Sequence, residues 1–181
     1  MKKKKIKRKE IVFKSTKGKN INVWVSLPSD YKNTKLPGLT AWVTALNSGK
    51  YRQNNSSLCE KLSTGKFGYC CLGVLSKTQG RLIPLPSTNK NMNKNMKGDG
   101  KDECNVDEFY LASDNPVFNI LGGSGDLPKG VVVNAYNKTE LAMDGAPVFH
   151  CSDATSLVAL NDDLKLSFKD IAKVLKLIYK P

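Results

Sequence analysis

Alternating apolar positions near the start of the chain predict a β-hairpin. Between Ile21 and Leu27 every second residue is apolar, and Ile11 and Phe13 precede this run across a polar break. Alternation with a period of two is typical of strands that bury one face. Residues 11–27 are therefore expected to form two antiparallel strands.

The clearest helical pattern lies near the other end of the chain. Ser167 is a favourable N-cap, and Asp170 occupies the third helical position. Apolar residues follow with the spacing i, i+3, i+4, i+7 and i+10, namely Phe168, Ile171, Ala172, Leu175 and Ile178. This pattern predicts an amphipathic helix that packs on the core with one face.

Shorter helices are expected in the first half of the chain. Apolar residues after Thr40 cluster on one side of a helix until Asn47–Gly49, a sequence that favours a stop. Ser57 and Glu60 have the spacing of a capping box, which predicts another short helix. The apolar run Tyr69–Leu75 is too short for periodicity to decide between a buried strand and the start of a buried helix.

Composition separates a folded body from more polar segments. Residues 1–9 lack the apolar content to bury a core and are expected to form a disordered basic tail. Residues 88–103 are rich in Asn, Lys and Gly, which predicts a mobile surface loop. A strand is expected at 131–133. We therefore predict a single globular domain over 10–181 of the α+β class, with a small antiparallel sheet packed with several short helices and the C-terminal amphipathic helix.

The positive charge is concentrated at the start of the chain. The net charge is +13, and residues 1–20 hold ten basic residues against the single acid Glu10, a net of +9. The remaining residues therefore carry only +4. A cluster of this kind gives sequence-independent affinity for nucleic acid. The tail residues expected to contact it are Lys2, Lys3, Lys4, Lys5, Lys7, Arg8 and Lys9.

Cysteine usage and hydropathy point to a cytoplasmic protein. The five cysteines are odd in number and include an adjacent pair, which is a poor disulfide framework. No Cys-x-x-Cys pair with histidine partners indicates zinc, so neither a metal nor another cofactor is expected. No apolar run approaches the roughly 18 residues that a membrane span requires. The basic start lacks the apolar segment of a secretory signal.

One candidate for chemistry is the pair Cys70 and Cys71. A thiol at the start of a helix ionises more easily, and His150 downstream could act as its base, with Asn161 orienting the imidazole. This order of residues suggests a cysteine-dependent hydrolase or transferase. The competing interpretation, which we favour, is that both cysteines are small buried hydrophobic residues.

The preferred ligand site is the turn that follows the first predicted helix. Its basic and amide side chains could hold a phosphate or a carboxylate, and a helix beginning near Ser57 would add backbone amides. A capped turn with a solvated basic face is the alternative. The ligand-binding residues predicted here are Lys50, Tyr51, Arg52 and Gln53, completed by Asn161 and Asp162.

Four patches in a fixed order resemble a known group of small proteins encoded by bacteriophages and prophages. The patches are Trp42-x-x-Ala45-Leu46-x-Ser48-Gly49-x-Tyr51-x-Gln53, Cys70-Cys71-Leu72-Gly73-Val74-Leu75, Leu160-Asn161-Asp162 and Ser167-Phe168-x-x-Ile171-Ala172. The resemblance covers roughly residues 40–178, without the tail, the hairpin and the 88–103 loop. It implies an accessory protein that acts in the host cytoplasm.

The sequence thus supports a non-enzymatic, phage-encoded accessory protein that binds an anionic partner. That partner is expected to be a nucleotide, a nucleic acid or a host protein, with no membrane involved. The first alternative is the cysteine-dependent enzyme. The second is a minor structural protein of the virion that contacts packaged DNA through the basic tail.

Overall fold

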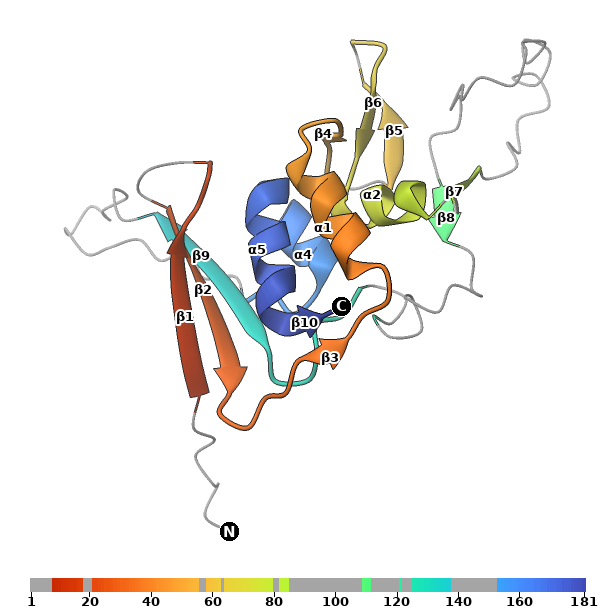
Figure 1. The fold of residues 1–181 in the computed structure, drawn as a ribbon. Coiled ribbons are helices and arrows are strands. Elements are labelled where there is room, and N and C mark those ends of the chain that lie inside the picture. The colour runs from red at the N-terminus through yellow and green to blue at the C-terminus, as the bar shows by residue number, and fades with distance from the viewer. Residues whose placement is uncertain are drawn as a thin grey trace.

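A computed structural model describes residues 8–17, 21–55, 58–62, 64–79, 82–84, 109–111, 121, 125–137 and 153–181. Within these ranges the fold is mixed α+β, with several small sheets and four helices, as predicted. Most of the predicted tail, the predicted loop at 88–103 and His150 lie outside the described residues. In Figure 1 the helices lie beside the sheet formed by residues 8–14, 21–28 and 132–137, with the shorter strands around them.

The largest sheet contains the predicted hairpin. Strands β1 (Arg8–Lys14), β2 (Ile21–Pro28) and β9 (Val132–Asn137) are antiparallel and lie in the order β1-β2-β9. The predicted tail of residues 1–9 is too long at its end. Arg8 and Lys9 belong to β1, where they pair with Pro28 and Leu27 of β2. The alternating residues of β2 are buried, as their period of two requires.

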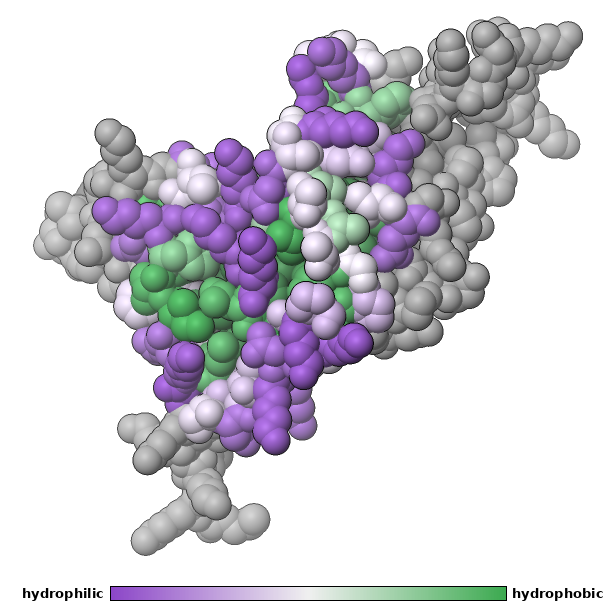
Figure 2. All heavy atoms as spheres, in the orientation of Figure 1, coloured by the Kyte–Doolittle hydropathy of each residue, from purple (hydrophilic) through white to green (hydrophobic). Residues whose placement is uncertain are grey.

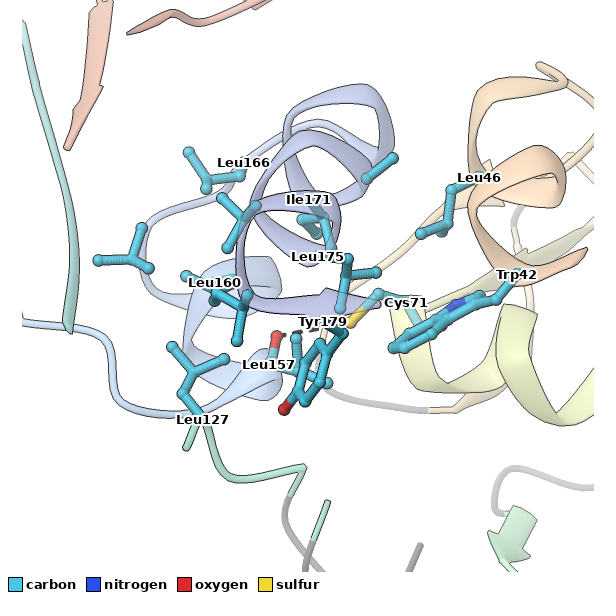
Figure 3. Packing of buried hydrophobic residues seen from close by; sticks show 14 of the residues in the cluster. Trp42, Leu46, Cys71, Leu127, Leu157, Leu160, Leu166, Ile171, Leu175 and Tyr179 are labelled. Atoms are coloured by element: carbon cyan, nitrogen blue, oxygen red, sulfur yellow. Dashed lines mark hydrogen bonds between the residues drawn. The ribbon is translucent and has the colours of Figure 1, made fainter. Parts of the chain in front are cut away.

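Four helices pack around one apolar core. They are α1 (Leu39–Asn47), α2 (Cys71–Thr78), α4 (Leu157–Asp162) and α5 (Phe168–Ile178). Ser167 caps α5 as predicted, with its Oγ accepting a hydrogen bond from the Asp170 backbone N–H at 3.1 Å. Figure 3 shows side chains from α1, α2, α4 and α5 meeting in the core, among them Trp42, Cys71, Leu157 and Leu175.

A second three-stranded sheet replaces the predicted helix after Ser57. Strands β4 (Arg52–Gln53), β6 (Phe67–Tyr69) and β5 (Cys59–Lys61) lie in that order, with β4 parallel and β5 antiparallel to β6. The helix prediction is therefore wrong. The segment after Ser57 pairs with β6 instead, and this pairing overrides the local helix-start signal.

Two further strand pairs complete the described fold. Strand β3 (Thr34–Lys35) is parallel to β10 (Tyr179–Lys180), and β7 (Leu82–Pro84) is antiparallel to β8 (Phe109–Leu111). The first pair joins the end of α5 to the segment that leads into α1. None of the helices in the described part of the chain is both long and apolar enough to cross a membrane.

Candidate functional site

Residues from the four sequence patches form hydrogen bonds inside the protein. The Trp42 indole N–H donates to the Cys71 carbonyl at 2.9 Å, and both residues are buried. The Cys71 thiol donates to the Leu157 carbonyl at 3.5 Å, which links α2 to α4 (Figure 3). These contacts fix the relative positions of α1, α2 and α4. The first two patches therefore contribute to the scaffold through Trp42 and Cys71.

Gln53 and Asn161, both predicted to bind a ligand, contact each other instead. The Gln53 side-chain amide donates to Asn161 Oδ1 at 3.0 Å and to the Leu166 carbonyl at 2.6 Å. The Asn161 amide donates to the Asn54 carbonyl at 2.8 Å and to Asp162 Oδ1 at 2.6 Å. Asn161 is completely buried. This network joins β4 to α4 and to the start of α5, and it holds the Gln53 side chain partly buried.

The Cys70 and Cys71 pair adopts the helical alternative, with Cys70 as the N-cap of α2. Cys70 Sγ accepts a hydrogen bond from the Gly73 backbone N–H at 3.4 Å, which favours a thiolate. Burial outweighs this effect and raises the pKa of the Cys70 thiol to about 11. Burial also raises the pKa of Cys71 well above its ordinary value. Both cysteines are buried, as the favoured interpretation predicted.

Gly73 explains why α2 begins so deep in the protein. A Cβ atom added to Gly73 would lie 1.7 Å from the Leu58 carbonyl oxygen, so only glycine permits this contact. The same carbonyl accepts a hydrogen bond from the Cys70 backbone N–H at 3.3 Å. The apolar patch around the cysteines is thus a helix packed against the backbone that leads into β5.

The candidate site is a hollow of about 260 Å³ beside the sheet β4-β6-β5. Its lining comes from the turn after α1, from the β5–β6 turn with β6, and from α2. It consists of four cationic and three aromatic side chains, namely Lys50, Arg52, Lys66, Lys77, Tyr51, Phe67 and Tyr69. Among the residues that the structure describes, no carboxylate contributes to this lining. The structure therefore places predicted residues Lys50, Tyr51 and Arg52 together and adds four residues that the sequence did not single out.

The aromatic residues of the hollow form a defined group. The Tyr51 and Tyr69 rings meet edge to face, with centroids 5.4 Å apart and an interplanar angle of 88°. Lys50 Nζ lies 5.9 Å from the centroid of the Tyr51 ring. Tyr51, Phe67 and Tyr69 are all partly exposed, so the hollow offers apolar ring surface to solvent. Such rings can stack on planar ligands.

Local contacts position Lys50 and Arg52 at the hollow. The chain leaves α1 through Gly49, whose positive φ of 70° suits glycine. The Ser48 hydroxyl then accepts a hydrogen bond from the Lys50 backbone N–H at 3.1 Å. Arg52 Nη1 lies 3.5 Å from Thr64 Oγ1 in the β5–β6 turn. Because Arg52 is exposed and Gln53 points inward, these neighbouring residues of β4 serve different parts of the structure.

The chemistry of this hollow is that of an anion site with a stacking surface. Guanidinium and ammonium groups bind phosphate or carboxylate, and aromatic rings hold a planar group next to it. No group of three or more His, Cys, Asp or Glu side chains in the described ranges could hold a metal ion. The expectation of a second helix N-terminus at the site is wrong, since β5 occupies that segment.

Comparison with known proteins identifies one family. Residues 39–178 match the model of a family described as Domain of unknown function (DUF8296). No curated protein and no solved structure matches the chain significantly. The matched range includes the hollow, whereas β1 and β2 precede it. It agrees closely with the range of the resemblance noted in the sequence.

Proposed function

We propose that this chain, which belongs to the family described as Domain of unknown function (DUF8296), binds a nucleotide unit. In this proposal it catalyses no reaction. The unit is either a free nucleotide or one residue of a single-stranded nucleic acid. The observation that carries this proposal is the joint presence of four cations and three aromatic rings around one hollow. A nucleotide combines the two groups that such a lining recognises, a phosphate and a planar base.

The dimensions of the hollow favour a single nucleotide unit. Pockets that enclose a drug-sized ligand usually measure about 300–1,000 Å³. The hollow, at about 260 Å³, is smaller. A base stacked on one of the rings would contribute roughly 1–3 kcal/mol, and a charged hydrogen bond from Arg52 to phosphate about 1.5–3 kcal/mol. The rest of a longer strand would remain outside the hollow.

The state of the cysteines supports binding over catalysis. A cysteine nucleophile must reach the thiolate form at neutral pH. Burial instead raises the pKa of both Cys70 and Cys71. Asn161, the proposed third member of the catalytic group, already uses its amide in the network with Gln53 and Asn54.

The biological setting is a further part of the proposal. The four sequence patches resemble proteins of bacteriophages and prophages, so we propose a phage-encoded accessory protein that acts in the host cytoplasm. Its partner is then a nucleotide or nucleic acid present in the infected cell. The alternative of a minor virion protein depends chiefly on residues 1–7, which lie outside the described residues.

Titration calorimetry with nucleoside monophosphates and with a short single-stranded oligonucleotide tests the proposal. Arg52→Ala is expected to weaken binding about 10- to 150-fold through loss of a charged hydrogen bond. Phe67→Leu keeps apolar volume but removes the aromatic face, and it should weaken binding of the oligonucleotide and of the monophosphates alike. Lys35→Ala, which removes an exposed cation outside the hollow, serves as the control.

The two ligands distinguish the two sources of the nucleotide unit. Tighter binding of the monophosphate would identify a free nucleotide, and tighter binding of the oligonucleotide would identify a strand. The proposal is overturned if neither ligand binds saturably. It is also overturned if Arg52→Ala and Phe67→Leu bind as tightly as the Lys35→Ala control.

A further inference from the structure

The net charge of this protein lies entirely in its two terminal segments. Residues 1–20 carry +9, and residues 164–181 contain five lysines and one aspartate, a net of +4. Because the whole chain carries +13, the segment 21–163 has no net charge. The C-terminal segment therefore carries a net positive charge of its own, in addition to the cations that line the hollow.

The fold places the tip of the β1–β2 hairpin against the start of α5. The Ser15 hydroxyl donates to Asp170 Oδ2 at 2.7 Å, and the Thr16 backbone N–H donates to Asp170 Oδ1 at 3.0 Å. Lys17 Nζ donates to the Lys165 carbonyl. Asp170 is completely buried, so these bonds hold the hairpin firmly on α5. Segments about 150 residues apart in sequence thus become neighbours.

Every exposed residue of α5 is a lysine. Lys169, Lys173 and Lys176 are exposed, and the other residues of the helix are buried or partly buried. At 1.5 Å per residue, these three lysines cover about 10 Å along the helix axis. We call the exposed lysines Lys17, Lys165, Lys169, Lys173 and Lys176 the basic face. Figure 2 shows hydrophilic surface over α5, between the apolar surface of the sheet and α1.

The basic face is only slightly neutralised from within the protein. Among the described residues, the carboxylate that an ion pair places beside it is Asp170, which accepts hydrogen bonds from the hairpin and lies 3.8 Å from Lys173 Nζ. Partial burial, followed by the nearby charge of Lys165, lowers the pKa of Lys17, against the opposing effect of Asp170. Like charges held this close repel one another, and an external polyanion relieves that repulsion.

We propose that the basic face binds the phosphate backbone of nucleic acid without reading its sequence. Lysine ammonium groups act as point charges for phosphates, and contacts of this kind position a nucleic acid without specifying its bases. The Phe13 ring lies under Lys173, whose Nζ is 5.1 Å from the ring centroid. The face differs from the hollow, where three rings stand beside four cations, and its function does not depend on ligand binding there.

The experiment compares two triple variants of the full chain that lose the same charge. The first, Lys169→Gln with Lys173→Gln and Lys176→Gln, removes the helical part of the basic face. The control, Lys32→Gln with Lys35→Gln and Lys129→Gln, removes three exposed lysines from outside the face. Fluorescence anisotropy measures binding to a random-sequence duplex and to a single strand over a range of salt concentrations. Both variants retain the tail, so its contribution cancels.

The salt dependence gives a quantitative expectation. Loss of three phosphate contacts should reduce the magnitude of the negative slope of log K against log salt by about 2.7 for duplex DNA and about 2.1 for a single strand. The control should change the slope by less than one unit. Equal changes in both variants would show that only total charge matters and would overturn the proposal, as would an unchanged slope in the first variant.

Chemical protection provides a second test without substitutions. Acylation of lysines in the wild-type protein, followed by mass spectrometry, should show Lys169 and Lys176 protected several-fold by bound nucleic acid. Lys32 and Lys129 should react as in the free protein. Equal protection of all four lysines would contradict a defined basic face.

Discussion

Two adjacent residues of β4 offer a sharp test of which side chains support the fold and which face the ligand. Gln53 points inward and donates to Asn161 Oδ1 and the Leu166 carbonyl. Arg52 is exposed and lies 3.5 Å from Thr64 Oγ1. We therefore expect Gln53→Ala to destabilise the protein and Arg52→Ala to leave its stability almost unchanged.

The magnitude follows from the acceptors that Gln53→Ala leaves behind. Two oxygen atoms, on Asn161 and Leu166, lose their donor. A buried unsatisfied group costs about 1–3 kcal/mol, and both bonds are only part-buried, so a total loss of about 2–3 kcal/mol is expected. For a chain of this size that corresponds to a fall in Tm of roughly 4–12 °C. Arg52→Ala should change the free energy of unfolding by less than about 0.5 kcal/mol.

Urea unfolding followed by circular dichroism measures both variants against the wild type. The expected order of stability is wild type and Arg52→Ala together, with Gln53→Ala clearly lower. Titration with nucleotide in the same buffer should give the reverse order of affinity loss, with Arg52→Ala binding nucleotide more weakly than Gln53→Ala. Equal stability of the two variants would refute the assignment of Gln53 to the scaffold.

Three further predictions concern the cysteine helix and the hairpin. Gly73→Ala places a methyl group against the Leu58 carbonyl and should cost about 3 kcal/mol or more in an unfolding titration. The pKa of Cys70 is about 9.0 when unfolded and about 11 in the fold, so its contribution to stability is intact below pH 9 and is lost as the pH rises to 11. Wild type and Cys70→Ala should therefore converge in stability over that range, and native thiol alkylation at pH 8 should stay slow. Asp170→Asn weakens charged hydrogen bonds to Ser15 and its neighbour, so it should cost about 1.5–3 kcal/mol and accelerate amide exchange at the hairpin tip.

Elements with a long or regular pattern were predictable from the sequence. Helix α5 has a full amphipathic period and a capping serine, and the β1–β2 hairpin has strict alternation, so local sequence specifies both. Strand β5 was not predictable in this way. The sequence pattern of Ser57 and Glu60 mimics a helix start, and the pairing of β5 with β6 determines the structure. The segment Tyr69–Leu75 remained ambiguous because the decisive contact, Gly73 on the Leu58 carbonyl, is tertiary.

The candidate site was half predictable for the same reason. Lys50, Tyr51 and Arg52 are contiguous, so their cationic and aromatic character is visible along the chain. The opposite wall reaches them through the parallel pairing of β4 with β6, which no local pattern encodes. Lys66 and Phe67 place a cation next to an aromatic ring beside a glycine turn, and this local pattern was the signal in the sequence that could have indicated the opposite wall. The inward turn of Gln53 became clear only with the position of Asn161.

Photo-crosslinking shows whether a base stacks on the rings of the hollow. A short single-stranded oligonucleotide that carries 5-bromouracil is irradiated with the wild-type protein, and the modified peptides are identified by mass spectrometry. A base stacked in the hollow should form adducts at Tyr51, Phe67 or Tyr69, and an excess of unmodified strand should suppress them. Saturable binding with adducts confined to other peptides, and none at these three rings, would contradict the account.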